Sequence, residues 1–120
     1  MCRLIAMSKT DTKFDKSDLY VFGGLVFLSS RAGNTDGVGV SANVAERLPL
    51  LKIGKKAADF VFGEPWHAWF AGLGKCDTLL GHVRSASFNW RAPYGQDHPT
   101  EHAHPHTCGE VLLMHNGIFD

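Results

Sequence analysis

The apolar residues of this 120-residue chain come in short runs, separated by polar segments that contain glycine and proline. The longest run, 19–28, has ten residues, whereas a membrane-spanning helix needs about 18 or more. Polar residues precede this run, and no signal-peptide pattern opens the chain. The pattern therefore predicts a domain that has no membrane anchor and resides in the cytoplasm.

The composition indicates one globular domain with no electrostatic affinity for polyanions. Hydrophobic residues make up 44% and charged residues 20% of the chain, which is enough apolar material for a core. Twelve Lys and Arg residues balance twelve Asp and Glu residues, so nucleic acid and anionic membranes are not expected partners, and a small neutral substrate fits better. Three cysteines form a sparse, odd set, typical of free thiols in a reducing compartment.

Periodicity predicts more strands than helices. Strands are expected over 2–7, 38–44, 48–53, 78–87 and 110–115, and helices over 19–31, 56–62 and 66–73. Ser17 or Asp18 could cap the first helix, but a strand competes there because Gly23 and Gly24 each weaken a helix by roughly 1 kcal/mol. Segment 88–107 is predicted to be a long polar loop. Strands with helices between them indicate a layered α+β domain with sheets covered on both sides.

Cys2 is the most informative residue for chemistry. It becomes the N-terminal residue if the initiator methionine is removed, which is expected because cysteine is small. A terminal cysteine carries a nucleophile, its thiol, and a base, its own α-amino group, on one residue. The alternative is that Cys2 is an ordinary buried thiol on a strand.

Five motifs in order give the chain a family resemblance. They are MCRLIA at the start, NTDGVGV at 34–40, GHVRSAS at 81–87, EHAHPH at 101–106 and MHNGIFD at 114–120. The chain resembles the class II glutamine amidotransferases, which belong to the N-terminal-nucleophile hydrolases. In that family a GH-x-R-x-A-[ST] strand, an AHPH-like loop and an HNG turn surround the terminal cysteine. The resemblance runs over essentially the whole chain and implies a glutamine amidotransferase type-2 domain over 1–120, with no cofactor.

The resemblance implies a role for each matching residue. Cys2 would attack the side-chain amide of glutamine, form a thioester and release ammonia, with its own amino group shuttling the proton. Asn116 and Gly117 would form the oxyanion hole through a side-chain amide and a backbone N–H. The resulting glutamate and ammonia would serve an acceptor site on a synthase domain or partner.

Substrate binding is implied for Arg84 and Ser87. Arg84 would grip the α-carboxylate of glutamine, which its planar fork of donors matches better than a lysine would. The alternative is a surface ion pair, although Arg84 lies inside the apolar run 78–86, where an unpaired guanidinium would be costly to bury. Ser87 would hold the substrate through its hydroxyl or backbone. His82, His104 and His115 match family histidines and are assigned to support of the site, with a purely structural role as the alternative.

Two other functions stay open. An N-terminal-nucleophile hydrolase of another amide would keep Cys2 and Asn116 without needing Arg84 to recognise glutamine. A zinc-binding module without enzymatic activity could use the alternating residues His102, His104, His106 and Cys108, although such tight spacing strains tetrahedral closure. Because AHPH already matches the amidotransferase loop, a metal is not required to explain this cluster.

The resemblance implies the four-layer αββα sandwich of N-terminal-nucleophile hydrolases, of which this chain would be the N-terminal portion only. The chain ends at Asp120, three residues after the HNG turn, whereas family members continue. No position matches the family aspartate that binds the α-amino group of glutamine. We therefore expect a fragment, or a split domain that another chain completes.

Overall fold

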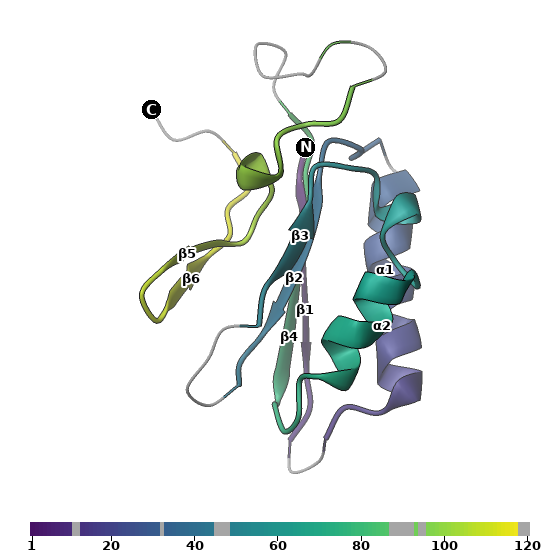
Figure 1. Ribbon diagram of the computed structural model, residues 1–120, viewed down its shortest axis with the longest axis vertical. Helices are drawn as coiled ribbons and strands as arrows, with labels where there is room; N and C mark the ends of the chain where they lie inside the picture. The colour runs from purple at the N-terminus through teal and green to yellow at the C-terminus, as the bar shows by residue number, and fades with distance from the viewer. Residues whose placement is uncertain (11–12, 32, 45–48, 87–92, 94–95, 118–120) are drawn as a thin grey trace.

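The described residues of the computed structural model form a four-stranded antiparallel sheet, two α-helices and a separate two-stranded hairpin (Figure 1). It describes residues 1–10, 13–31, 33–44, 49–86, 93 and 96–117. The α+β class predicted from the sequence is confirmed.

The sheet has the order β1-β4-β2-β3, and every pairing is antiparallel. Its strands are β1 (Arg3–Ser8), β2 (Val38–Ala42), β3 (Leu51–Ile53) and β4 (Thr78–Val83). In the register, Arg3 of β1 and Val38 of β2 both lie opposite Val83, the last residue of β4. The strand expected over 78–87 therefore ends at Val83. This register brings the start of β1, the end of β4 and the start of β2 together at one end of the sheet.

The helices α1 (Lys16–Arg31) and α2 (Glu64–Ala71) cover one face of the sheet (Figure 1). The core lies between the helices and the sheet, where Phe22 of α1 stacks on Trp66 of α2 with ring centroids 5.9 Å apart. Both side chains are fully buried, as is Leu79 of β4. A short 3-10 helix, η1 (Ala57–Asp59), replaces the helix expected over 56–62.

The helix prediction over 19–31 is confirmed against the competing strand, but the predicted cap is wrong. Asp15 caps the helix, because its side chain accepts a hydrogen bond from the Asp18 N–H at 3.0 Å. The Asp18 carboxylate accepts the Asp15 N–H in return at 2.8 Å, which is the reciprocal pattern of a capping box. Packing explains the glycine at position 23, because a Cβ there would lie 2.7 Å from the Phe62 ring. A Cβ at Gly24 would meet nothing within 4 Å.

The other face of the sheet carries residues 98–105, here called the strap, and then the hairpin of β5 (His106–Cys108) and β6 (Val111–Leu113). The helix η3 (Thr100–His102) lies within the strap. The long loop expected over 88–107 is thus partly wrong, because its described end contains η3 and the start of β5. Figure 1 shows the hairpin on the side of the sheet away from α1 and α2.

The strap lies so close to the sheet that glycines are needed beneath it. A Cβ built at Gly39 of β2 would overlap the carbonyl oxygen of His104, and one built at Gly54 would overlap that of His98. Lys52 of β3 fastens the strap from the side, because its Nζ donates to the carbonyls of Ala103 at 3.0 Å and Pro105 at 3.4 Å. Gly39, the last residue of the TDG-x-G stretch, therefore leaves the space on β2 that the strap backbone occupies.

No helix in the described part of the chain combines the length and the apolar character that crossing a membrane requires.

Candidate functional site

Cys2 and Arg84 meet at the end of the sheet where β1 begins and β4 ends. The half-buried Cys2 thiol donates to the Ser85 carbonyl, with a sulfur-to-oxygen distance of 3.6 Å. The Ser85 N–H in turn donates to the sulfur at 3.4 Å. The sulfur of Cys2, the predicted nucleophile, thus contacts the backbone of Ser85, the residue after the predicted carboxylate-binding Arg84. This contact lies at the strand ends and not in the core beneath the helices.

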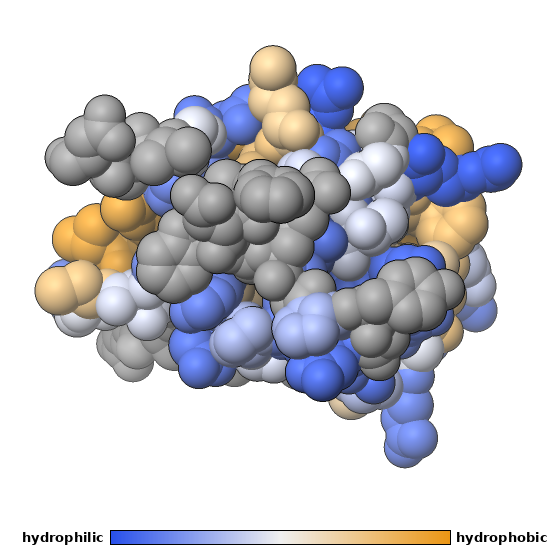
Figure 2. All heavy atoms as spheres, turned by 90° about the horizontal axis from the view of Figure 1, so that it is seen from above, coloured by the Kyte–Doolittle hydropathy of each residue, from blue (hydrophilic) through white to orange (hydrophobic). Residues whose placement is uncertain are grey.

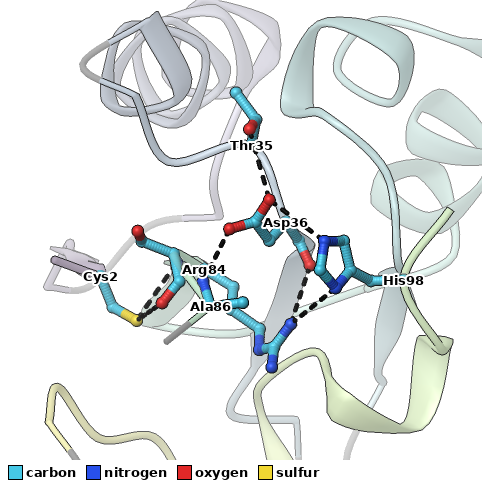
Figure 3. A network of polar contacts seen from close by, with 7 residues as sticks. Cys2, Thr35, Asp36, Arg84, Ala86 and His98 are labelled. Carbon is cyan, nitrogen blue, oxygen red and sulfur yellow. Dashed lines mark hydrogen bonds and ion pairs between the residues drawn. The ribbon is translucent and has the colours of Figure 1, made fainter. Parts of the chain in front are cut away.

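Arg84 is held by the turn before β2. Its backbone N–H donates to the Gly37 carbonyl at 2.7 Å, and its carbonyl accepts from the Asp36 N–H at 3.1 Å. In the side chain, Nη1 donates to the Asp36 carbonyl oxygen and to Nδ1 of His98, both at 3.3 Å (Figure 3). Nε and Nη2 of this half-buried guanidinium form no hydrogen bond with the described residues. The described partners of Arg84 do not include the acidic side chain that a surface ion pair would require.

Asp36 and His98 complete this network, and the sequence analysis missed both. The Asp36 carboxylate accepts the Ala86 N–H at 2.7 Å and the Thr35 hydroxyl at 3.4 Å. Its Oδ1 also lies 3.2 Å from Nε2 of His98 (Figure 3). Asp36 stands in the NTDGVGV motif without an assigned role, and His98 matches no motif. No local signal connects two residues that lie so far apart in the sequence.

The predicted supporting histidines form a second cluster, packed between the sheet and the strap. The rings of His82 and His104 lie with centroids 4.2 Å apart, and those of His104 and His115 lie 4.4 Å apart. His106, which the sequence analysis assigned only to the zinc alternative, contributes a fourth ring at 4.4 Å from His104. The structure thus brings all three predicted supporting residues together.

One nitrogen of the buried His82 ring makes both of its polar contacts. Nε2 lies 3.1 Å from the His115 carbonyl and 3.0 Å from Nδ1 of His104. Nδ1 is buried and has no hydrogen-bond partner among the described residues. Burial lowers the pKa of His82 to about 4, and burial together with the charge of the neighbouring His82 lowers the pKa of His104 to about 3. Both rings are consequently neutral near pH 7.

The predicted oxyanion-hole residues follow the histidine cluster along the chain. Asn116 and Gly117 lie in an exposed bend directly after His115, whose carbonyl is bound to His82. Gly117 has a φ of 123°, a conformation that favours glycine. Within the described residues, no hydrogen bond joins the Asn116 side chain to Cys2. Ser87, the second predicted substrate-binding residue, lies outside the described residues.

Figure 2 looks onto the end of the molecule that carries the candidate site, where the described surface is mostly hydrophilic. In the described part of the chain, no three or more His, Cys, Asp or Glu residues are arranged to hold a metal ion. The alternating set from His102 to Cys108 is divided, because His104 is a buried residue of the strap and Cys108 is exposed on the hairpin. Geometry therefore does not favour the zinc-binding alternative.

No protein-family model, curated protein or solved structure matches the chain.

Proposed function

We propose that the protein hydrolyses the side-chain amide of glutamine through Cys2, as a class II glutamine amidotransferase does. The observation that carries the proposal is the contact of the Cys2 sulfur with the Ser85 backbone, directly after Arg84. A nucleophile and the backbone of a cationic residue lie at the same end of the sheet, an arrangement that suits an amide substrate bearing a carboxylate.

The reaction begins at a terminal cysteine. Met1 is 82% exposed, which leaves it accessible for removal. The freed α-amine then takes the thiol proton as sulfur attacks the amide carbon of glutamine, and a tetrahedral intermediate forms. The amine returns this proton to the leaving nitrogen, the carbon–nitrogen bond breaks, and ammonia and a thioester result. Water hydrolyses the thioester, which regenerates the thiol and yields glutamate.

The other residues stabilise charge and orient the substrate. Asn116 and the Gly117 N–H serve as donors to the oxyanion, and such donors typically contribute about 10²- to 10³-fold in rate. The free edge of Arg84 binds the α-carboxylate in a fork, with Ser87 as a further contact. The buried His82 ring contacts the carbonyl of His115, the first residue of the HNG turn. The ammonia passes to a nitrogen acceptor on a synthase partner in the cytoplasm.

The proposal extends to the fold. An antiparallel sheet with two helices on one face corresponds to two layers of the αββα sandwich of N-terminal-nucleophile hydrolases. Apolar side chains on the strap side support further layers there: Leu4 is 46% exposed, and Val111 and Leu113 on the hairpin are 65% and 49% exposed. An experimental structure of the protein with its partner would overturn this part if water covers that side of the sheet.

The first test is replacement of the nucleophile. Cys2→Ala should abolish both glutamine hydrolysis and covalent labelling by an electrophilic glutamine analogue, while Cys108→Ser, which changes an exposed thiol, should leave both intact. Intact mass should show that Met1 is absent from the labelled protein, and circular dichroism should show that both variants fold. Labelling that survives Cys2→Ala, or a wild-type protein that neither hydrolyses glutamine nor reacts with the analogue, would refute the proposal.

A substrate panel separates glutamine from other amides. Arg84→Ala should raise KM for glutamine strongly and leave neutral amides unaffected, and Arg84→Lys should restore only part of the binding because a lysine lacks the planar fork. If the wild-type enzyme prefers a neutral amide and Arg84→Ala changes nothing, the protein is an N-terminal-nucleophile hydrolase of another amide.

A further inference from the structure

We propose that His98 and Asp36 are positioning residues for Arg84, which together orient the guanidinium so that its free edge faces the substrate carboxylate. The proposal rests on the assignment of Arg84 in the proposed function. It concerns the arrangement here called the Asp36 bridge, which runs from the Asp36 carboxylate through the His98 ring to the Arg84 guanidinium (Figure 3).

The contacts of the bridge select one tautomer of His98. A guanidinium has five N–H donors and no acceptor, so Nδ1 of His98, 3.3 Å from Nη1 of Arg84, must be the accepting nitrogen. The proton of the neutral ring is then on Nε2, which lies 3.2 Å from Oδ1 of Asp36. A carboxylate is the partner that a ring N–H prefers, so Asp36 holds the ring in the form that Arg84 requires.

The bridge orients the arginine without occupying its binding edge. A direct ion pair with a carboxylate would use two parallel donors of the guanidinium. Here the Asp36 carbonyl, and not its carboxylate, accepts from Nη1 of the Arg84 guanidinium, while the carboxylate is engaged with the Ala86 N–H and the imidazole. Nη1 thus makes two hydrogen bonds, while Nε and Nη2 make none with the part of the chain that the structure describes.

Burial and backbone contacts keep the bridge in one geometry. The side chains of His98 and Asp36 are 9% and 15% exposed, so water competes weakly for their contacts. The backbone of His98 lies directly on Gly54, since its N–H donates to the Gly54 carbonyl at 3.0 Å and its own carbonyl occupies the space of a Cβ there. The position of His98 is therefore determined by the backbone of the strap and not by its side chain alone.

Substitutions at the bridge should change substrate binding rather than chemistry. His98→Phe keeps the ring volume but removes the acceptor, and should raise KM for glutamine about 10- to 100-fold, the range for a lost hydrogen bond to a charged group. The kcat should stay within about threefold of wild type. His98→Asn can present an oxygen near the position of Nδ1, and should recover part of the affinity. Asp36→Asn keeps the shape but removes the charge that fixes the tautomer, and should also raise KM.

A neutral substrate supplies the matched control. The α-carboxamide of glutamine lacks the negative charge that Arg84 binds, so its KM should be the same in wild type and in the bridge variants. If His98→Phe raises KM equally for both substrates, or lowers kcat and leaves KM unchanged, the positioning role is refuted. Thermal unfolding of each variant shows whether it is folded at the assay temperature.

The tautomer can be measured without any activity. In the ¹⁵N-labelled wild-type protein at pH 7.5, the NMR signals of His98 should show an unprotonated Nδ1 and a protonated Nε2, and Asp36→Asn should shift the ring away from this form. A protonated Nδ1 in the wild-type protein would overturn the bridge. Failure of the proposed function would differ, since the wild type would neither hydrolyse glutamine nor react with the electrophilic analogue, whatever the tautomer.

Discussion

Replacing Gly39 by alanine should destabilise the protein, although at most positions alanine loses less conformational entropy on folding than glycine does. Gly39 pairs with Lys52 of β3 on one side and His82 of β4 on the other, so β2 cannot retreat from the strap. The new Cβ would overlap the His104 carbonyl oxygen and lie 2.9 Å from the Lys52 Cβ. To remove this overlap, the strap would have to move away from the sheet.

The expected cost follows from what surrounds the new methyl group. Overpacking typically costs 1–3 kcal/mol, and we expect about 3 kcal/mol here because the main obstacle is backbone. Lifting the strap also weakens the hydrogen bonds from Lys52 to the carbonyls of Ala103 and Pro105. At this chain length, 1 kcal/mol corresponds to about 4 °C, so the melting temperature should fall by roughly 12 °C.

The matched control is the same chemical change in α1. Gly24→Ala meets nothing within 4 Å and should stabilise the protein by about 1 kcal/mol, or roughly 4 °C, through helix propensity. Both variants can be measured by thermal and urea unfolding followed by circular dichroism. A Gly39→Ala protein that melts at or above the wild-type temperature would refute the close approach of strap and sheet.

Two further predictions concern the pH dependence of stability and the reactivity of the thiols. Burial lowers the pKa of His82 to about 4 and that of His104 to about 3 from the ordinary 6.5, so the unfolded state binds more protons than the folded state below pH 6.5. Urea unfolding should show the full free energy of unfolding above that pH and a loss of about 2 kcal/mol per histidine at pH 5. A free energy of unfolding that stays constant from pH 7.5 to 5 would contradict the buried cluster. Cys108 is exposed, whereas Cys76 is 6% exposed and burial raises the pKa of its thiol. Iodoacetamide should therefore modify Cys108 first and Cys76 only after unfolding, as peptide mass mapping can show. Equal rates of modification would show that Cys76 is accessible in the folded protein.

Most secondary structure was predictable because its causes are local. Alternation and short apolar runs predicted all four strands of the sheet, and periodicity predicted helices that overlap α1 and α2. The errors also have local reasons. The cap of α1 was missed because Asp15 and Asp18 act as a pair, and β5 was missed because a three-residue strand of polar residues has no hydrophobic signature.

The sequence by itself determined the α+β class, the order of the elements and the prominence of Cys2, Arg84 and the histidines, because periodicity, turn chemistry and motif spacing are properties of neighbouring residues. Only the tertiary structure decided that Asp36 and His98 contact Arg84, and that the strap packs directly against glycines. Those contacts join segments remote from one another in the chain. They exist because the antiparallel register brings strand ends together, and because burial of polar groups there favours hydrogen bonds between them.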